Sequence, residues 1–378
     1  MFFLLKLSIK IIGGGIFKVN LSAYEIDFNF CPVYIIINEE ISPYMATMEQ
    51  VARLANVSPA TVSRVLNNPV TVSLDTRERV LKAIKSLDYE PNFLGRFLRT
   101  TQTNIVLVLV HSIDNPFFAD IVNGIENIAT VYDYNVIMAN NHGSKEIGNR
   151  FISMMKNHLI DGIILLSNEL DVGELDNLAA EYPLVQVIEY NKQSKADAIC
   201  IDYYKASREL MDNFVALGRR NIAFINTNEM PIISTNEKYQ AYLDCLGENG
   251  FPILTKPPLS LEEFGYDTSY EITVKLLKKH PQLDAIFTCS DMIAAGACAA
   301  CQDHGKRVPE DIAISGFDDI FYAKINSPTI TTVSHDTFNL GFTAMNHILK
   351  KINDEKPENN RIILPYEIIY RESAPKKE

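Results

Sequence analysis

The most constraining feature of the chain is the stretch of residues 47–67, TMEQVARLANVSPATVSRVLN, which predicts two short helices around a tight turn. Its apolar residues recur at helical spacing in two separate runs. Ser58 stands just before the second run, where its hydroxyl can cap a helix, and Val57 falls in the turn. The residues expected to point inward are Met48, Val51, Ala52, Leu54 and Ala55 from the first helix and Val62, Val65 and Leu66 from the second.

The outer surface of the second helix has a composition that suits the major groove of DNA. Small residues near its N-terminus let the backbone approach base edges, and hydroxyl and amide side chains reach phosphates. Arg64 can pair with guanine through two hydrogen bonds. Any small amphipathic helical hairpin would show the same periodicity, so this pattern alone leaves both interpretations open. The outward residues are Pro59, Ala60, Thr61, Ser63, Arg64 and Asn67.

A third amphipathic helix is expected over residues 74–88. Pro91 prevents its continuation, and Asn92 can cap one more short helix over residues 93–98. A polar linker, residues 100–104, follows. The inward residues of the third helix are expected to be Val80, Leu81, Ile84 and Leu87.

Three segments, ATMEQVARLANVSPATVSRVLNN, VSLDTRERVLKAIKSLDYEPN and FLGRFLRTTQT, resemble the lactose-repressor family of bacterial transcription regulators in order and spacing. The resemblance implies a homodimer that binds double-stranded, pseudo-palindromic operator DNA and responds to a small-molecule effector. It also implies that Leu98 is a hinge leucine that inserts between base pairs in the minor groove. The DNA contacts expected on these grounds are Thr47, Ser58, Pro59, Ala60, Thr61, Ser63, Arg64, Asn67, Asn92, Arg96 and Leu98.

The same resemblance extends over residues 46–372 and implies a domain organisation. A helix-turn-helix headpiece is expected at 45–91 and a hinge helix with its linker at 92–104. The core for effector binding and dimerisation is expected at 105–378, as two lobes with chain crossings near 201 and 333.

Residues 1–44 are expected to lie outside this organisation. Their apolar start resembles a secretion signal, but Lys6 and Lys10 interrupt it, and no small-residue cleavage site precedes a mature domain. No stretch reaches the roughly 18 apolar residues of a membrane span. Met45 precedes the headpiece directly, which favours translation from Met45; a real but poorly ordered extension is the alternative.

Charge is distributed unevenly along the chain. The formal net charge is −12, which taken alone would argue against a nucleic-acid partner. Residues 46–104, however, hold eight Lys and Arg against five Asp and Glu, a balance of +3. A basic headpiece on an acidic body keeps phosphate attraction local.

From Asn104 onward, buried-strand patterns alternate with helical ones, which predicts an α/β fold. We expect a two-lobed core of doubly wound parallel sheets, similar to periplasmic binding proteins, behind the three-helix headpiece and hinge helix. Ligands of such sheets bind beyond the carboxyl ends of the strands, so a cleft between the lobes should hold the effector. The expected strands are 105–111, 135–140, 162–166 and 185–189 in the first lobe, and 221–226, 285–289 and 312–317 in the second.

The residues that follow these strands are the candidate effector site. Aromatic faces can stack on sugar or nucleoside rings, and Asp or Asn side chains can bind hydroxyls. By resemblance, Asp318 matches an aspartate that contacts effector hydroxyls, and Lys238 stands where many members carry an arginine. Ordinary loop capping is the alternative role for each residue. The candidates are Asp114, Phe117, Phe118, Asn141, Ser167, Lys238, Asp291, Phe317 and Asp318.

Two branches of the family compete for the identity of the effector. NEMP at 228–231 and the segments DNPFF and DGIILL resemble the cytidine-repressor branch, whereas GIENIATVYDYNVIMAN resembles the catabolite-control-protein branch. The second branch implies a phosphorylated carrier protein as partner. His304 stands where that resemblance would call for an arginine, which weakens phosphoserine pairing and favours a nucleoside or sugar effector.

Other classes of function find no support in the sequence. Phosphate-binding glycine loops, HExxH and GxSxG motifs are absent, and no catalytic, metal or cofactor site is expected. The seven histidines have no partner by spacing, and Cys298 and Cys301 lie in a helical run as expected for reduced core thiols. A periplasmic sugar binder is disfavoured by the headpiece. The sequence therefore predicts a cytoplasmic, non-enzymatic regulator.

Overall fold

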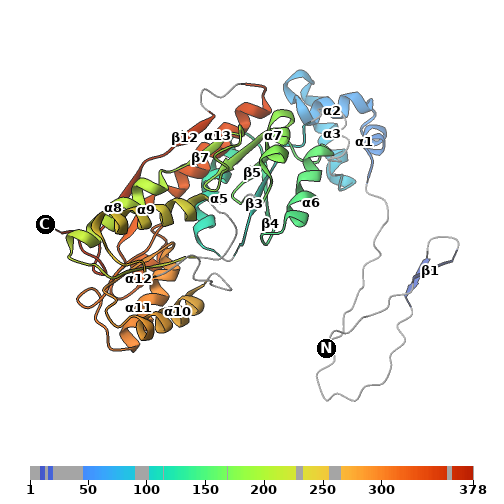
Figure 1. Cartoon of the computed structure of the whole chain (residues 1–378). Coiled ribbons are helices and arrows are strands. Elements are labelled where there is room, and N and C mark those ends of the chain that lie inside the picture. The colour runs from blue at the N-terminus through green and yellow to red at the C-terminus, as the bar shows by residue number, and fades with distance from the viewer. Residues whose placement is uncertain are drawn as a thin grey trace, which may run out of the picture. The chain divides into compact units, whose positions relative to one another are not determined.

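The computed structural model of the chain describes residues 9–12, 16–19, 46–89, 102–113, 115–167, 169–226, 233–254, 265–355 and 360–377 (Figure 1). Two compact units divide the chain, Met1–Asn92 and Phe93–Glu378. In the first unit, β1 (Ile9–Ile12) and β2 (Ile16–Val19) pair as an antiparallel hairpin. The hinge helix expected at 93–98 lies outside the described residues.

Four helical segments lie in the described residues 46–89 of the first unit, and local capping explains where two of them begin. Thr47 and Gln50 cap the first helix reciprocally, and Asn56 ends it in the left-handed region at φ 54°. Ser58 accepts a hydrogen bond from the Thr61 amide at 3.2 Å and so begins the second helix. The segments are α1 (Met48–Ala55), α2 (Pro59–Asn67), the 3-10 helix η1 (Pro69–Thr71) and α3 (Leu74–Ser86).

The core of these helices is small and contains most of the predicted inward residues. Two predictions were wrong, because Leu54 is 57% exposed and Leu81 is 46% exposed. Both leucines flank the buried ridge of their helix, and no other described element of this unit covers those flanks. The buried members are Val51, Ala52, Ala55, Val62, Val65, Val80, Ala83 and Tyr89.

The first lobe of the second unit is built on a six-stranded parallel sheet in the order β12-β7-β6-β5-β3-β4. Strand β3 (Ile105–Val110), which lies between β5 and β4, is buried on both faces from its second residue onward, as expected for a parallel sheet covered by helices on both sides. The strands are β3 (Ile105–Val110), β4 (Asn135–Asn140), β5 (Gly162–Leu165), β6 (Leu184–Val187), β7 (Ala198–Cys200) and β12 (Arg361–Ile363).

Alternate side chains of β3 enter two different core clusters. Val106, Val108 and Val110 pack with α5 (Phe117–Val131) and α13 (Thr337–Ile352), whereas Leu107 and Leu109 pack with α6 (Lys145–Lys156) and α7 (Val172–Glu181). This two-residue alternation is the geometry of a strand, so it assigns one helix pair to each face of the sheet.

Helices α5 and α13 approach so closely that their backbones touch at two glycines. A Cβ added at Gly124 would lie 2.1 Å from the Phe338 carbonyl oxygen, and one at Gly341 would lie 1.9 Å from the Ile121 carbonyl oxygen. Only glycine fits at either position.

The described residues of the second lobe form a three-stranded parallel sheet, a two-stranded antiparallel sheet and five helices (Figure 1). The parallel sheet has the order β10-β9-β8 and is buried throughout. The described elements of the second lobe are α8 (Tyr203–Ala216), β8 (Ile222–Ile225), α9 (Ile233–Asn249), α10 (Tyr266–Lys279), β9 (Ala285–Thr288), α11 (Asp291–Asp303), β10 (Ala313–Ser315), α12 (Phe321–Ile325), β11 (Thr332–His335) and β13 (Tyr366–Ile369).

The chain passes between the lobes at three places. It crosses from β7 to α8 near residue 201, from β11 to α13 near residue 336, and from β12 to β13 near residue 365. The third passage is not among those expected from the sequence, because two three- to four-residue strands joined by a short link carry little periodic signal.

Candidate DNA-binding and effector sites

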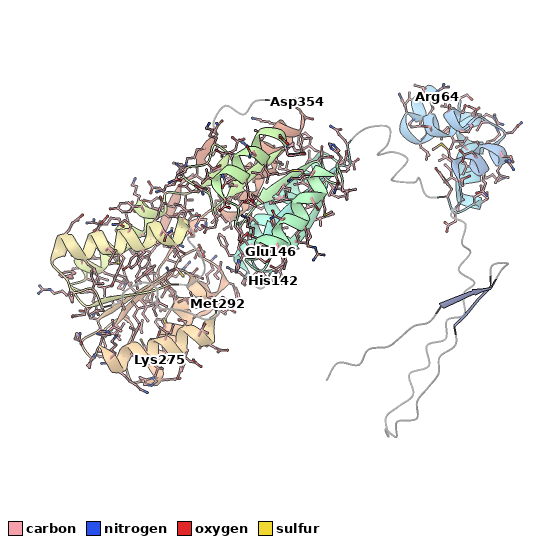
Figure 2. All side chains as sticks on the ribbon, turned by 45° about the vertical axis from the view of Figure 1, so that its right-hand side comes forward. Arg64, His142, Glu146, Lys275, Met292 and Asp354 are labelled. Atoms are coloured by element: carbon pink, nitrogen blue, oxygen red, sulfur yellow. The ribbon has the colours of Figure 1, made fainter. Side chains whose placement is uncertain are left out.

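Most of the residues predicted to contact DNA lie on α2 or at its start. Pro59, Ala60 and Arg64 are exposed, and Figure 2 shows Arg64 on the outside of its unit. Thr47 and Ser58, also predicted DNA contacts, use their hydroxyls to cap α1 and α2. Thr61 and Ser63 are half-buried. The side chain of Asn67, together with Asn92, Arg96 and Leu98, lies outside the described residues.

In the second unit, the segment after β10 carries two of the predicted effector residues, Phe317 and Asp318. Asp318 and Asp319 both adopt positive φ, at 97° and 52°, which is a strained conformation for residues other than glycine. Hydrogen bonds to β11 hold the segment, since the Asp318 amide donates to the Val333 carbonyl at 2.9 Å. Such strain persists only where the surrounding structure imposes it.

Asp291, predicted to contact the effector, braces this segment from behind. Its fully buried carboxylate accepts a hydrogen bond from the Ile320 amide at 2.8 Å. A Cβ on Gly316 would lie 2.1 Å from Asp291 Oδ1, so the segment passes directly over the carboxyl group. Burial raises the pKa of Asp291 well above its ordinary value. Its observed contacts are those of a positioning group.

Lys238 is buried among aromatic rings. Its ammonium lies 3.7 Å from the centroid of the Phe317 ring and 5.5 Å from that of Tyr203, and it donates to the Cys289 carbonyl at 3.0 Å. One face of Phe317 is therefore taken by this cation–π contact. Phe317 holds Lys238 in place, which is a different use of the ring from the predicted stacking on an effector.

Asp318 faces His335, which the sequence did not identify as a site residue. Asp318 Oδ1 lies 3.9 Å from His335 Nε2, beyond hydrogen-bond distance. Burial raises the pKa of Asp318 to about 6, while the nearby Lys238 opposes that rise. Burial also lowers the pKa of His335 to about 3, and Lys238 lowers it further. The imidazole is therefore neutral at physiological pH and can donate one hydrogen bond and accept another.

Phe117, at the start of α5 in the first lobe, reaches the same place. Its ring centroid lies 5.5 Å from that of His335 and 5.4 Å from that of Phe118, both in edge-to-face geometry. We name Phe117, Lys238, Phe317, Asp318 and His335 the interlobe cluster. It brings together four of the nine predicted effector residues.

A polar contact joins the two lobes beside this cluster. Glu189, which follows β6 in the first lobe, accepts hydrogen bonds from the hydroxyl and amide of Ser234 in α9. Burial raises the pKa of Glu189 above its ordinary value despite these bonds. In the observed arrangement of the lobes, Ser234 therefore supplies the hydrogen bonds that stabilise this buried carboxyl group.

The first-lobe residues Asn141 and Ser167 form a separate network. Asn141 Nδ2 donates to Ser167 Oγ at 2.9 Å and to Glu169 Oε2 at 2.5 Å. His111 Nδ1 lies 3.9 Å from Glu169 Oε1. These polar groups form hydrogen bonds within the chain, which agrees with the alternative role of capping loops. Asp114, a further candidate, lies outside the described residues.

Several buried polar atoms near the interlobe cluster have no hydrogen-bond partner within the described part of the chain. Buried groups of this kind are uncommon in folded proteins, and a ligand is one way to satisfy them. Both nitrogens of His335 belong to this set, which sequence reasoning could not find because their isolation arises from packing. The other members are Tyr203 Oη, Asn226 Oδ1, Asp291 Oδ1 and Ser315 Oγ.

The remaining chemistry of the described residues is structural. Cys298 and Cys301 are buried in α11, and burial raises the pKa of both thiols, to about 12 for Cys301. His347, given no partner by sequence spacing, lies 3.0 Å from Asp197. The described segments hold no cluster of three or more metal-binding side chains. Their helices include none with the length and hydropathy needed to cross a membrane.

Comparison with known families gives two matches that follow the two units. Residues 47–92 match the model of bacterial regulatory proteins of the lacI family. Residues 103–372 match that of periplasmic binding proteins and the sugar-binding domain of the LacI family. The second match alone covers most of the chain, and it agrees with the parallel sheets of the two lobes.

Individual relatives agree with these matches. The chain is 35% identical over 333 residues to the HTH-type transcriptional regulator RegA of Clostridium saccharobutylicum, covering 87% of this chain and 100% of the relative. It is 32% identical to catabolite control protein A of Priestia megaterium, covering 87% and 99%. Among solved structures, a transcriptional regulator CelR–cellobiose complex matches with a TM-score of 0.64 and 29% identity, covering 87% of this chain and 99% of that one.

Proposed function

Since the chain belongs to the lacI family of bacterial regulatory proteins and is a DNA-binding transcriptional regulator, we propose that α2 reads an operator and the interlobe cluster binds an uncharged, hydroxyl-bearing ring. Effector binding shifts the arrangement of the lobes and thereby changes operator affinity, and the coupling is reciprocal. The observation that carries this proposal is the set of unpartnered buried polar atoms around Phe117 and Asp318.

The charges near the cluster support an uncharged ligand. Two acidic residues, Glu189 and Asp318, lie close to Lys238, whose ammonium is already engaged by the Phe317 ring and the Cys289 carbonyl. A phosphorylated small molecule would bring two negative charges toward these carboxyl groups. Neutral sugars and nucleosides avoid this repulsion. The CelR–cellobiose complex, a solved relative, is consistent with the sugar class.

A homodimer would present two copies of α2 to a pseudo-palindromic operator. Two exposed apolar surfaces of the core support self-association. On α12, Phe321 is 66% exposed and Ile325 is 57% exposed, one helical turn apart. On β4, an edge strand of the first-lobe sheet, Ile137 and Met138 are exposed as well.

A phosphorylated carrier protein is the second candidate partner. The similarity to catabolite control protein A favours it. His304, expected at such an interface, ends α11, and its Nδ1 lies 2.9 Å from the Ala300 carbonyl oxygen. A histidine held in this way has fewer hydrogen-bond donors for a phosphate group than an arginine has.

The DNA arm of the proposal can be tested by selecting duplexes from a randomised pool with the wild-type chain. We expect two inverted half-sites, as a twofold dimer requires. Arg64→Ala should weaken binding by roughly 1–3 kcal/mol and abolish preference at one base pair per half-site. Arg53→Ala removes the same charge from α1 and should weaken selected and random duplexes alike. Equal behaviour of the two variants would contradict base reading by Arg64.

The effector arm uses a panel of neutral nucleosides, neutral sugars and a serine-phosphorylated carrier protein, titrated against the selected duplex. We expect a neutral compound to change wild-type operator affinity. Asp318→Asn and Phe117→Ala should bind the duplex normally but respond at least about tenfold less to that compound, because a buried ligand hydroxyl loses its acceptor or its ring contact. A response to the carrier protein alone, unaffected by both substitutions, would favour the second candidate.

A further inference from the structure

The chain enters the core through Thr103 and Asn104, and a single carboxylate holds both residues. Asp161 Oδ1 accepts hydrogen bonds from the Thr103 amide at 2.8 Å and the Thr103 hydroxyl at 2.9 Å. Its Oδ2 accepts one from the Asn104 amide at 2.8 Å. Hydrogen bonds to an ionised acceptor are stronger than neutral ones. Three of them on two successive residues fix this point of the backbone.

The direction of the chain is fixed at the same point. Asn104 has a φ of 55°, in the left-handed region that asparagine tolerates, and so turns the chain into β3. Its carbonyl accepts from the Asn135 amide at 2.8 Å, and its Nδ2 donates to the Asp133 carbonyl at 3.0 Å. The entry point is therefore bonded to the starts of β4 and β5 as well as to β3.

The second lobe repeats this device where it has no DNA-binding segment to hold. Asp284 directly precedes β9, as Asp161 directly precedes β5. It accepts hydrogen bonds from the amides of Arg220 and Asn221 at 2.9–3.1 Å and from Asn221 Nδ2 at 3.2 Å. These residues precede β8, the counterpart of β3. The two aspartates differ in what lies upstream: helix α8 of the same lobe for Asp284, and the DNA-binding unit for Asp161.

Asp161 is also close to a helix that begins at the interlobe cluster. The next residue, Gly162, has no Cβ, and one added there would lie 3.0 Å from Ile348 and 3.4 Å from Ile352 of α13. Helix α13 starts at Thr337, two residues after His335. A displacement of α13 by ligand would therefore press directly on the strand start that carries Asp161.

We propose that Asp161 is a positioning residue for operator binding: its carboxylate fixes where the DNA-binding segment leaves the core, so that the core can control operator affinity. This inference rests on the proposed function. It assigns to Asp161 a role that Asp284, with the same chemistry, does not have. Without these hydrogen bonds, the headpiece keeps its fold and its phosphate contacts. It loses the fixed attachment point on the core that specific binding to the operator requires.

The test compares full-length Asp161→Asn with Asp284→Asn, because asparagine keeps the shape but offers a backbone amide one fewer acceptor. The measurements are affinity for the duplex selected by wild type, affinity for a random duplex of equal length, and thermal stability. We expect Asp161→Asn to lose about tenfold in affinity for the selected duplex and about twofold or less for random DNA. Asp284→Asn should keep the wild-type ratio at a comparable loss of stability.

Two further measurements keep the inference testable if Asp161→Asn folds poorly. Thr103→Val removes only the hydroxyl bond and should show a smaller loss of the selected-to-random ratio in a well-folded chain. Hydrogen exchange of the Thr103 and Asn104 amides should accelerate in Asp161→Asn and stay unchanged in Asp284→Asn.

The outcomes distinguish a failure of the positioning role from a failure of the proposed function. An unchanged ratio in Asp161→Asn or Thr103→Val, or the same loss in Asp284→Asn, would overturn the positioning role. If the wild type shows no preference for any duplex, the proposed function fails instead.

Discussion

The two lobes of the core treat the polar side chains at their strand ends in opposite ways. In the first lobe, Asn141, Ser167 and Glu169 bond to one another. In the second lobe and its crossing segment, His335 and Asn226 are buried with polar atoms that have no partner among the described residues. Figure 2 labels His142 and Glu146 at the end of the first lobe and Met292 at the start of α11 in the second. From this difference we expect the second lobe to supply most of the polar contacts to the proposed effector and the first lobe to supply the ring of Phe117.

The largest effect is expected where backbones touch in each lobe. Gly341→Ala would place a Cβ 1.9 Å from the Ile121 carbonyl oxygen, and Gly296→Ala would place one 2.3 Å from the Tyr266 carbonyl oxygen. Each should lower the free energy of unfolding by about 3 kcal/mol or more, because two backbones must separate. Gly173→Ala in α7 meets no atom within 4 Å and should raise stability by up to about 1 kcal/mol. Denaturant titration measures all three, and a harmless Gly341→Ala would contradict the close α5–α13 contact.

The next prediction uses pH to test the burial of the Asp318 carboxyl group. Its pKa is raised from 3.8 to about 6 in the folded state, mainly by burial, so the folded chain favours the protonated form. The stability that this preference contributes is present below pH 3.8 and is lost as the pH rises through 6. Asp318→Asn should therefore raise the free energy of unfolding at pH 7 by up to about 3 kcal/mol and flatten its change between those limits.

Asp171 of the first lobe is the control for this pH dependence. A hydrogen bond from Lys145 lowers its pKa, so its contribution is lost as the pH falls, the opposite direction. Its exposure makes that contribution small. Denaturant titrations from about pH 3 to about pH 7 cover the change at Asp318 and the onset of the opposite change at Asp171. A loss of stability at pH 7 in Asp318→Asn would show that its carboxylate is satisfied by contacts within the chain.

The smallest effect is expected from Ser167→Ala in the first lobe. Asn141 Nδ2 loses its 2.9 Å bond to the hydroxyl but keeps its bond to Glu169, so only one of its two N–H groups loses an acceptor. Stability should fall by about 1 kcal/mol, and ligand response should stay within about threefold of wild type. Isothermal titration with the neutral compound identified for the wild type checks the second value. A loss as large as that of Asp318→Asn would move the polar half of the site into the first lobe.

Much of the architecture could be predicted from local pattern. The alternation of strand and helix patterns placed β4 at its observed bounds, and it placed β3, β5, β6, β8, β9 and β10 within one or two residues. The turn and caps of the headpiece follow from Thr47, Ser58 and Asn56. These features depend on residues close together in the chain, where hydrogen bonding and helical periodicity act directly. Leu54 and Leu81 were misplaced because burial on a helix flank depends on which other helix covers it.

The sequence by itself determined the two kinds of unit, the family resemblance and the position of Asp318 after a strand, because each is written in contiguous residues. Only the tertiary structure decided how those residues are used. It turned Asp291 behind the loop to brace it, placed Lys238 over Phe317, and brought His335 to Phe117 and Asp318. It also tied Thr103 and Asn104 to an aspartate more than fifty residues away. Desolvation and long-range contacts arise only when distant segments pack together. The spacing of residues along the sequence therefore does not predict them.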